Sequence, residues 1–379
     1  MNLLKIFYYT LSLTTLIITV FCIIFPNDML NSTKSALNLW YSVIVPSLLP
    51  FLIISDLLQQ TAITKFFSRL LSPIMNKIFH LPGISSMAVF LGMTGGYPVG
   101  AKVTADLRNK NLISYSDAKH LIAFTNNAGP LFLSAAIGIG LYKSPNIGFL
   151  LILSHYFSAL LVGFIFRFLK KQKQNNIDKK LEFKIFKMSD LGSILSNIIK
   201  NSILIVCTIG GFIILFSLIS TILEKLNITT IIANLIMPTL PQELSNGIIA
   251  GILEVTNGVN KISKIDIPIF NKLIITSILI GFGGFSIHMQ TLGILSNSDI
   301  KFLPYFCGKL LQAFISGLLT FVLIKYTFFE NILSVATSTI TGSINSYAFI
   351  QLVFIIFFLL IIIIILKIMK VLYKPRKIR

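Results

Sequence analysis

The stretch Leu91–Lys102, with the sequence LGMTGGYPVGAK, decides how the rest of the chain is interpreted, because it places four glycines and a proline in an apolar region. An uninterrupted membrane helix would contain few of these residues, so the stretch predicts a break in a helix. A broken helix at membrane depth frees backbone N–H and C=O groups, which are tolerated only where protein or a polar cavity satisfies them. Many transporters build a substrate site in this way. Because Gly92, Gly96 and Gly100 are four residues apart, a close contact between two helices is the alternative.

A second segment of the same kind, Gly247–Lys261, favours the broken helix. The matched positions, separated by 154 to 159 residues and occurring in the same order, are Gly92 with Gly251, Lys102 with Lys261, 126–138 with 281–293, and Gly163 with Gly317. Few residues are identical between the two halves. The order and the spacing nevertheless indicate a duplicated unit with one shortened loop.

Composition identifies the chain as a polytopic membrane protein. Of its 379 residues, 55% are hydrophobic and 12% are charged, and the mean hydropathy is +0.86, which leaves too little polar surface to cover a soluble protein. The formal net charge of +19 does not indicate nucleic-acid binding, because the lysines lie in short clusters beside apolar runs, as membrane topology requires. Cys22, Cys207 and Cys307 lack the spacing of a disulfide framework or a zinc site, so we predict no metal centre.

Eight stretches are long and apolar enough to cross a bilayer. They are residues 6–25, 37–58, 118–142, 147–168, 194–223, 268–295, 302–326 and 347–366. Two of them are expected to be discontinuous, because they contain Thr125–Pro130 and Gly281–Gly284. The first is interpreted as a retained helix and not as a signal peptide, since no small-residue cleavage site follows it.

Two further regions, 82–107 and 238–264, have limbs too short to cross and are expected to form re-entrant hairpins. Before the first of them, residues 63–80 place Lys65, Arg69 and Lys77 among apolar residues, which fits an amphipathic helix in the headgroup plane. Three full crossings separate the hairpins, so the second unit should be upside down relative to the first. The predicted fold is therefore an all-α polytopic membrane protein with two inverted repeats, each containing a re-entrant hairpin and a discontinuous helix.

Positive charge predicts the orientation of the chain. Residues 167–187 carry eight lysines and arginines against two acidic residues, and the C-terminal tail is also basic, so both termini and this linker are expected in the cytoplasm. The predicted division is 1–60 for N-terminal transmembrane helices, 61–170 for the first repeat, 171–190 for the basic cytoplasmic linker, 191–328 for the second inverted repeat, and 329–379 for a polar loop, the last transmembrane helix and the basic tail.

Polar residues at the predicted breaks and hairpin tips are the candidates for substrate binding. Glu254 is a functional candidate because a charge at membrane depth is costly, with pairing to a nearby lysine as the alternative. Lys102 and Lys261 could either touch substrate or extend to the interface. His288 could move a proton or be a packed, hydrogen-bonded side chain. The predicted substrate-binding set is Thr94, Gly95, Gly96, Tyr97, Asn126, Asn127, Glu254, Thr256, Asn257, Gly283, Gly284, Ser286, His288 and Gln290.

Enzyme signatures are absent from the sequence. It contains no paired-carboxylate motif, no Walker or Rossmann glycine pattern, no HExxH and no nucleophile elbow. We therefore predict no catalytic residues and no cofactor. An ATP-driven pump is therefore not expected.

Four motifs together resemble one family. They are Gly96–Lys102 (GYPVGAK), Thr125–Phe132 (TNNAGPLF), Glu254–Gly258 (EVTNG) and Gly283–Gln290 (GGFSIHMQ). Over roughly residues 35–370 the chain resembles the sporulation integral membrane proteins of the YlbJ type, in the nucleoside-recognition (Gate) domain group. The resemblance implies an architecture similar to concentrative nucleoside transporters, whose hairpins and broken helices form the substrate site. It also allows H⁺ or Na⁺ as a coupling cation, because such nucleoside carriers are cation-coupled. It also implies movement of dipicolinic acid from the mother cell across the outer forespore membrane of a spore-forming bacterium.

The leading hypothesis is thus a secondary transporter of a small anion, embedded in the lipid bilayer, with no nucleic-acid partner and with a homo-oligomer left open. Half-helix N-termini would offer unbonded N–H groups and positive dipole ends to two carboxylates. A nucleoside carrier is the nearer alternative, because amides suit a neutral base and ribose. A non-transporting protein of spore-envelope assembly is the other. For a carrier, the two breaks should approach each other and the hairpin tips near mid-membrane.

Overall fold

The computed structural model describes residues 3–60, 63–169 and 191–326, and these residues form helices joined by short connections, without a strand. The basic linker 171–190 and the predicted crossing 347–366 with its basic tail lie outside the described residues. The all-α class predicted from the sequence is confirmed for the part of the chain that is described.

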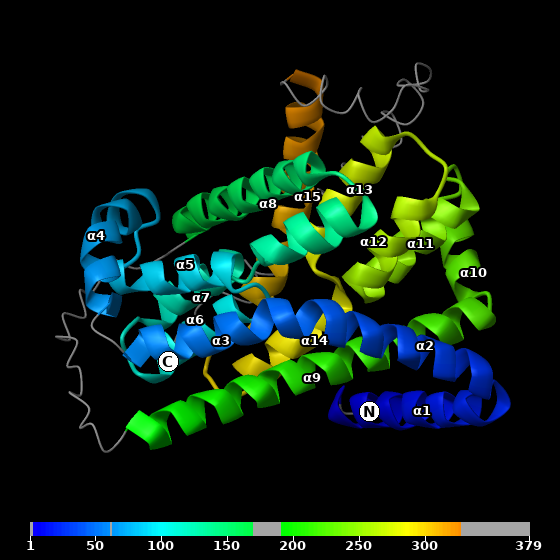
Figure 1. Ribbon diagram of the computed structural model, residues 1–379, viewed down its shortest axis with the longest axis horizontal. Coiled ribbons are helices and arrows are strands. Elements are labelled where there is room, and N and C mark those ends of the chain that lie inside the picture. The colour runs from blue at the N-terminus through cyan, green and yellow to red at the C-terminus, as the bar shows by residue number, and fades with distance from the viewer. Residues whose placement is uncertain (1–2, 61–62, 170–190, 327–379) are drawn as a thin grey trace, which may run out of the picture.

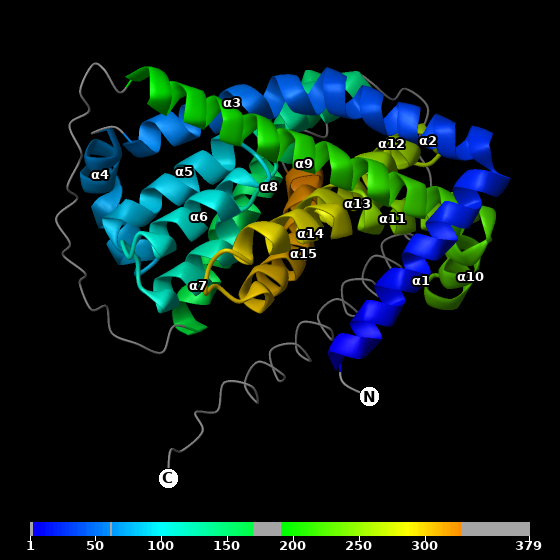
Figure 2. The ribbon, with the colours of Figure 1, turned by 90° about the horizontal axis from the view of Figure 1, so that it is seen from below.

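Two long helical segments lie side by side across one face of the molecule, as Figures 1 and 2 both show. The segments are α2 (Pro26–Leu39), the π-helix η1 (Trp40–Ile44) and α3 (Val45–Gln60) on one side, and α9 (Leu191–Lys225) on the other. Trp40 joins them, because its Nε1 donates to the carbonyl oxygen of Val206 at 2.8 Å. We call these two segments the frame.

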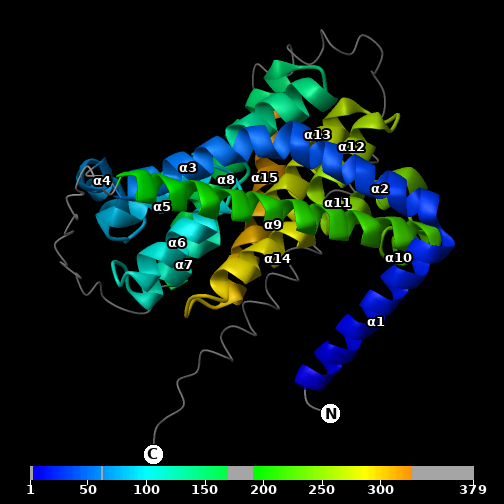
Figure 3. The same cartoon turned by 60° about the horizontal axis from the view of Figure 1, so that its bottom comes forward.

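At the N-terminus, α1 (Leu3–Ile24) leaves the frame sharply and extends away from the bundle (Figure 3). The bend between 12–24 and 26–44 is 109°. It falls at Pro26, which has no N–H to continue the helix that precedes it.

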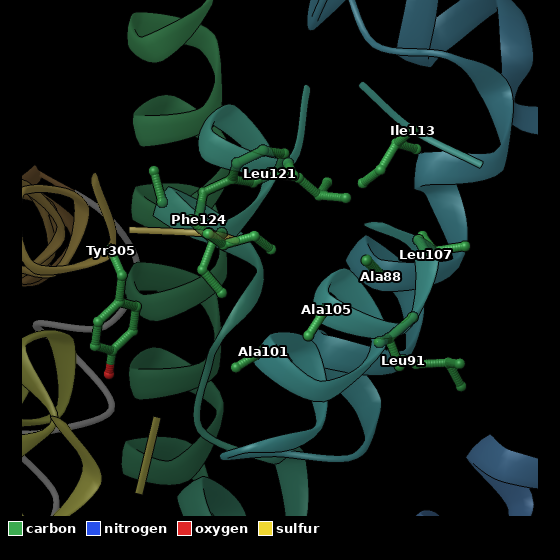
Figure 4. Close-up of a cluster of buried hydrophobic side chains, with 14 of the residues drawn as sticks. Ala88, Leu91, Ala101, Ala105, Leu107, Ile113, Leu121, Phe124 and Tyr305 are labelled. Atoms are coloured by element: carbon green, nitrogen blue, oxygen red, sulfur yellow. The ribbon is translucent and has the colours of Figure 1, made fainter. Parts of the chain in front are cut away.

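A helical hairpin, which we call hairpin 1, follows the amphipathic segment. Its limbs are packed against each other and against the next helix, and Figure 4 shows their buried side chains in one cluster with Tyr305 beside Phe124. Gly92 and Gly100 allow this approach, since a Cβ on either would lie 1.9 Å from the carbonyl oxygen of Thr125. The amphipathic segment is α4 (Ile63–Ile78), and it is followed by the short η2 (Gly83–Ser85). The two limbs of hairpin 1 are α5 (Ser86–Thr94) and α6 (Val99–Asn109), and the next helix is α7 (Tyr115–Thr125).

The first break follows α7, where residues 126–129 are not helical. The chain then continues as η3 (Phe132–Leu141), a π-helix, and returns through α8 (Pro145–Phe166) and the short η4 (Arg167–Leu169). π-Helical turns are rare and are frequently found at functional sites. The discontinuity predicted at Thr125–Pro130 is therefore present in the structure.

The second half contains a matching hairpin, hairpin 2, and a matching break. Glu254 is the single non-helical residue at the tip of hairpin 2, and Gly283, with φ of 90°, interrupts the next helix. This left-handed conformation favours glycine. After the short α10 (Ile228–Ile236), the two limbs of hairpin 2 are α11 (Gln242–Leu253) and α12 (Val255–Lys264). The interrupted helix consists of α13 (Ile269–Phe282) and α14 (Gly284–Leu295), and α15 (Phe302–Tyr326) follows it.

Four described helical stretches are long and apolar enough to cross a membrane, and six are if each of two bent pairs forms one span. The four are Pro145–Leu169, Leu191–Lys225, Ile269–Leu295 and Phe302–Lys325. The expected crossing 118–142 consists of two short pieces, α7 and η3, on either side of the first break. Eight crossings therefore stay a prediction.

One ion pair places two distant loops on the same end of the bundle. Arg108 at the end of hairpin 1 donates from Nη2 to Asp299 Oδ2 at 2.7 Å, and Asn109 Nδ2 donates to the carbonyl oxygen of Asn297 at 3.1 Å. The guanidinium of Arg108 holds the pKa of the Asp299 carboxyl below its ordinary value. The pair therefore persists into mildly acidic solution and is lost only as the pH falls through that lowered pKa.

Candidate functional site

The tip of hairpin 1 contacts both helix breaks. Gly96 lies against the first break, because a Cβ added to it would stand 3.0 Å from the backbone nitrogen of Gly129. Tyr97 reaches the second, where its hydroxyl donates to the carbonyl oxygen of Ile280 at 2.8 Å, just before Gly283. The structure thus brings together segments that are far apart in the sequence.

Hairpin 2 contacts the second break. A Cβ added to Gly284 would lie 3.1 Å from both the carbonyl oxygen of Gly251 and the backbone nitrogen of Val255, which flank the tip. Gly284 also has a positive φ, of 75°, so its backbone geometry and its surroundings both disfavour a side chain. Each hairpin tip is therefore seated on at least one of the two breaks.

At the centre of these segments lies Lys309 of α15, whose side chain is 1% exposed. Its ammonium donates to the carbonyl oxygen of Asn126 at 2.8 Å, to Gln312 Oε1 at 2.7 Å and to the Tyr97 hydroxyl at 3.4 Å. It also stands 4.9 Å from the centre of the Tyr97 ring. Among the described residues no carboxylate contacts Lys309. A buried ammonium held only by neutral groups is energetically expensive, which marks it as a functional candidate.

Gln312 extends this network to the first break and to α8. Its Nε2 donates to Asn127 Oδ1 at 2.8 Å and to the carbonyl oxygen of His155 at 3.2 Å. The backbone N–H of Ala128 donates to His155 Nε2 at 3.1 Å. Because Nε2 accepts a hydrogen bond, a neutral His155 carries its proton on Nδ1. Within the described residues that buried Nδ1 has no hydrogen-bond partner.

The predicted residues of the first half divide into two groups. Tyr97, Asn126 and Asn127 belong to the network around Lys309, and Asn126 Nδ2 also donates to Thr291 Oγ1 of α14 at 3.0 Å. Gly95 and Gly96 form the tip beside them. Thr94 stays apart from the network, because its hydroxyl donates to the carbonyl oxygen of its own helix at residue 90.

Three predicted residues on α14, namely Ser286, His288 and Gln290, are buried, and within the described part of the chain none of them is hydrogen-bonded to Lys309. Gln290 Nε2 lies 3.3 Å from Ser286 Oγ, one turn away on the same helix. His288 is packed among aromatic rings, and its Nδ1 lies 3.2 Å from the Tyr305 hydroxyl. This geometry suits the packed, hydrogen-bonded histidine that the sequence left open.

Glu254 caps the helix that follows it. Its carboxylate oxygens accept hydrogen bonds from the backbone N–H groups of Thr256 at 3.1 Å and Asn257 at 2.7 Å, and the side chain is 3% exposed. The N-terminus of α12 is thus already occupied by an anion. Lys261, the nearest lysine in the sequence, is paired with Glu224 of α9 and not with Glu254.

A cavity of about 920 Å³ opens beside hairpin 2, between α2, η1, η3, α9 and α12. We call it the hairpin 2 cavity. Its volume is in the range of sites that hold small organic ligands. Hydroxyl, amide and carboxylate groups line it, including Asn38, Ser42, Ser217, Glu254, Thr256 and Asn257. Three residues of the predicted set therefore face a space large enough for a substrate.

Each hairpin is tied to the frame by one ion pair. Lys102 of hairpin 1 pairs with Asp56 of α3, and Lys261 of hairpin 2 pairs with Glu224 of α9. The first pair is mostly buried, with side chains 16% and 12% exposed, and the second is about one third exposed. Both lysines are therefore engaged with frame carboxylates.

Comparison with known proteins identifies the family. The family model described as Gate, nucleoside recognition, matches residues 41–172, which include hairpin 1 and the first break. The sporulation integral membrane protein YlbJ of Bacillus subtilis (strain 168) is 33% identical over 373 residues, covering 93% of this chain and 91% of the relative. This chain belongs to the YlbJ family. The family is one of sporulation membrane proteins and not a class of enzymes, and no solved structure matches the chain.

Lys309, Gln312 and His155 of this YlbJ family member are absent from the predicted substrate-binding set. They lie inside the expected crossings 302–326 and 147–168, away from the breaks and hairpin tips where the predicted residues stand. A signal was available, because Lys309 and Gln312 stand three residues apart in an apolar helix, a spacing that puts them on one face. An ionisable residue inside such a helix is by itself a functional candidate.

Reversing charge in the hairpin ion pairs tests their role. We expect Lys102→Asp to destabilise this family member by about 2 to 4 kcal/mol, since it leaves two half-buried carboxylates together. The double variant Lys102→Asp with Asp56→Lys should recover most of this loss. The more exposed pair Lys225–Asp28 is the matched control, where reversal should change stability by less than about 1 kcal/mol. Thermal unfolding in detergent measures the variants of both pairs, and equal losses at the two pairs would contradict the assignment of the buried pair as the stronger attachment.

Proposed function

We propose that this protein is a secondary transporter that carries a small anionic metabolite, dipicolinic acid, from the mother cell across the outer forespore membrane. The observation that carries the proposal is the seating of both hairpin tips on helix breaks, with a polar cavity of about 920 Å³ beside the tip of hairpin 2. Backbone at a helix break is tolerated inside a membrane where it serves a site of this kind. The family relative named for sporulation supports the cellular setting.

Two inverted repeats are part of the proposal. The order of elements supports them, because each half contains a long frame segment, a short helix, a hairpin, a broken helix and a single long helix. Alternating access would then be a movement of the hairpins and broken helices against the frame. In this proposal Glu254 binds the coupling cation, H⁺ or Na⁺, because it is a buried carboxylate that faces the cavity.

The orientation follows from the positive-inside rule, with both termini and the 171–190 linker in the cytoplasm. Cysteines placed singly at Asn111 and at Ser144, in a background without the three native cysteines, should then label oppositely with an impermeant thiol reagent in intact cells. Asn111 follows hairpin 1 on the cytoplasmic side, and Ser144 follows η3 on the other. A third cysteine at Lys179 in the linker should behave like Asn111. Equal labelling of Asn111 and Ser144 would overturn this topology.

Transport is tested with the full chain in vesicles that contain no other protein. Terbium ions trapped inside the vesicles become luminescent when dipicolinate enters, so the signal reports flux directly. We expect uptake that exceeds that of protein-free vesicles and that responds to a proton or sodium gradient. Absence of dipicolinate uptake under every gradient would contradict the proposed function.

A nucleoside carrier is the second candidate function, favoured by the nucleoside-recognition description of the matching family model and by the hydroxyl and amide groups of the hairpin 2 cavity. Uptake of labelled uridine in the same vesicles separates the two substrates. Uridine uptake without dipicolinate uptake would support the nucleoside carrier. If deletion of the gene produces defective spores and the protein transports neither solute, a role in envelope assembly would be supported.

A further inference from the structure

Lys309 is a buried cation without a counter-charge among the described residues that surround it. Its three hydrogen-bond acceptors are a backbone carbonyl, an amide oxygen and a phenol hydroxyl, all of them neutral. Mutual attraction between two buried charges offsets much of the energy of removing each from water, and here the described residues supply only one of the two charges. The position is therefore electrostatically complementary to an anion.

Tyr97, at the tip of hairpin 1, lies next to Lys309. Its ring and hydroxyl contact the ammonium directly. The preceding residue, Gly96, contacts Leu48 and Gly129, each two positions from a residue that lines the hairpin 2 cavity. The tip of hairpin 1 thus contacts Lys309 and also contacts residues that lie two positions from the lining of the hairpin 2 cavity.

A second donor is available at the same place. His155 is 1% exposed, and its Nδ1 has no hydrogen-bond partner within the described residues. The ring lies against Tyr97, with centroids 6.5 Å apart, and Gln312 connects it to Lys309. Buried polar groups are nearly always satisfied by protein, water or ligand. This N–H is therefore a buried donor in the same network that a ligand could satisfy.

We infer that Lys309 binds a carboxylate of the transported solute, and that the ring and hydroxyl of Tyr97 occupy this position when no solute is bound. This inference rests on the proposed function and names the group that recognises the anion. The ligand class is a small planar carboxylate, for which Lys309 supplies the charge and His155 a neutral hydrogen bond. The tip of hairpin 1 must move so that Tyr97 leaves the ammonium of Lys309 before the anion can reach it.

The test measures equilibrium binding to the purified full chain in lipid nanodiscs, using dipicolinate, benzoate and neutral uridine as probes. Lys309→Gln should weaken dipicolinate binding about tenfold or more, because a charge-assisted hydrogen bond is lost. Lys309→Arg should retain most of the affinity. Lys325→Gln, which removes a charge from an exposed position on the same helix, is the matched control and should bind dipicolinate normally.

Tyr97→Phe tests whether the Tyr97 hydroxyl occupies the anion position in the empty protein or instead helps to bind the anion. The change removes the hydroxyl contacts to Lys309 and to Ile280 while keeping the ring. If the hydroxyl stabilises the empty state, the variant should bind dipicolinate a few-fold more tightly. A smaller fraction of the protein would then have Tyr97 on Lys309, where it prevents binding. Weaker binding would show that the hydroxyl contacts the anion and would overturn this part of the inference.

The outcomes distinguish the inference from the proposed function. If the wild-type chain transports dipicolinate and Lys309→Gln binds it with unchanged affinity, Lys309 is not the anion site, although the transporter stands. If carboxylates bind in a Lys309-dependent way but are not transported, the site stands and the function fails. If no carboxylate binds the wild-type chain, the inference is overturned. Lys309→Met monitored by thermal unfolding shows whether the lysine is merely structural, because a structural role would lower stability without altering the preference for carboxylates over uridine.

Discussion

Gly100→Ala is expected to prevent hairpin 1 from packing on the first break, with a loss of more than about 3 kcal/mol in stability, at the upper end for overpacked sites. The new Cβ would lie 1.9 Å from the carbonyl oxygen of Thr125 and 2.5 Å from its carbonyl carbon. These are backbone atoms at the end of α7, which cannot rotate away as a side chain could. The hairpin or the helix end must therefore shift.

The matched control is Gly293→Ala in α14, where no heavy atom lies within 4 Å of the added Cβ. Alanine has the higher helix propensity, so this control should be neutral or slightly stabilising. Thermal unfolding and the monodisperse yield after detergent extraction measure both variants. If Gly100→Ala is as stable as the control, α6 and α7 are not packed as described.

Glu254→Gln is expected to leave the protein folded but to remove the dependence of transport on the coupling cation. An amide oxygen still accepts one of the two N–H bonds at the start of α12, so the cap is largely kept. A neutral amide cannot exchange a proton at physiological pH and binds a cation more weakly than a carboxylate does. The measurement is dipicolinate uptake across a series of pH values and sodium concentrations.

Three companions sharpen the Glu254 experiment. Glu243→Gln changes an exposed carboxylate at the start of the same hairpin and should leave the cation dependence intact. Asn127→Ala and Asn257→Ala should lower affinity for substrate, by about 1 to 3 kcal/mol where a buried partner is left unsatisfied, without changing that dependence. Unchanged cation dependence of Glu254→Gln would leave the carboxylate with the structural role of a helix cap.

The breaks were predictable from sequence because their signal is local. Glycine, proline and asparagine in an apolar run disfavour a continuous helix whatever surrounds them, and the interruptions occur at 126–129 and at Gly283, within the predicted stretches. Glu254 was found for a similar reason, as an acidic residue between two apolar limbs. Its role as the cap of α12 depends on where that helix begins, which the composition of the hairpin does not determine.

The contacts around Lys309 could not be predicted because they join residues far apart in the chain, although Lys309 and Gln312 themselves could have been noticed as polar residues in an apolar helix. Lys309 contacts Asn126 and Tyr97 across 183 and 212 positions, and Gln312 contacts Asn127 across 185. The ion-pair partners of Lys102 and Lys261 are also far away in the chain. The sequence therefore left open whether these two lysines touch the substrate or extend to the membrane interface. The number of crossings suffered from a related limit, since hydropathy records apolar length but not the bends at Pro26 and near residue 80.

The length of α9 has a consequence for the membrane around the protein. Its 35 residues correspond to a helix of about 50 Å, whereas the hydrocarbon core of a bilayer is about 30 Å thick. The helix must therefore tilt strongly or extend beyond the hydrocarbon at its polar first third, which contains Asn197 and Lys200. Its far end carries Glu224, the partner of Lys261 in hairpin 2. A thinner or thicker bilayer would change the tilt of α9 and would therefore move Glu224 and the ion pair that it forms with Lys261. The chain length of the surrounding lipids would in this way affect the position of hairpin 2.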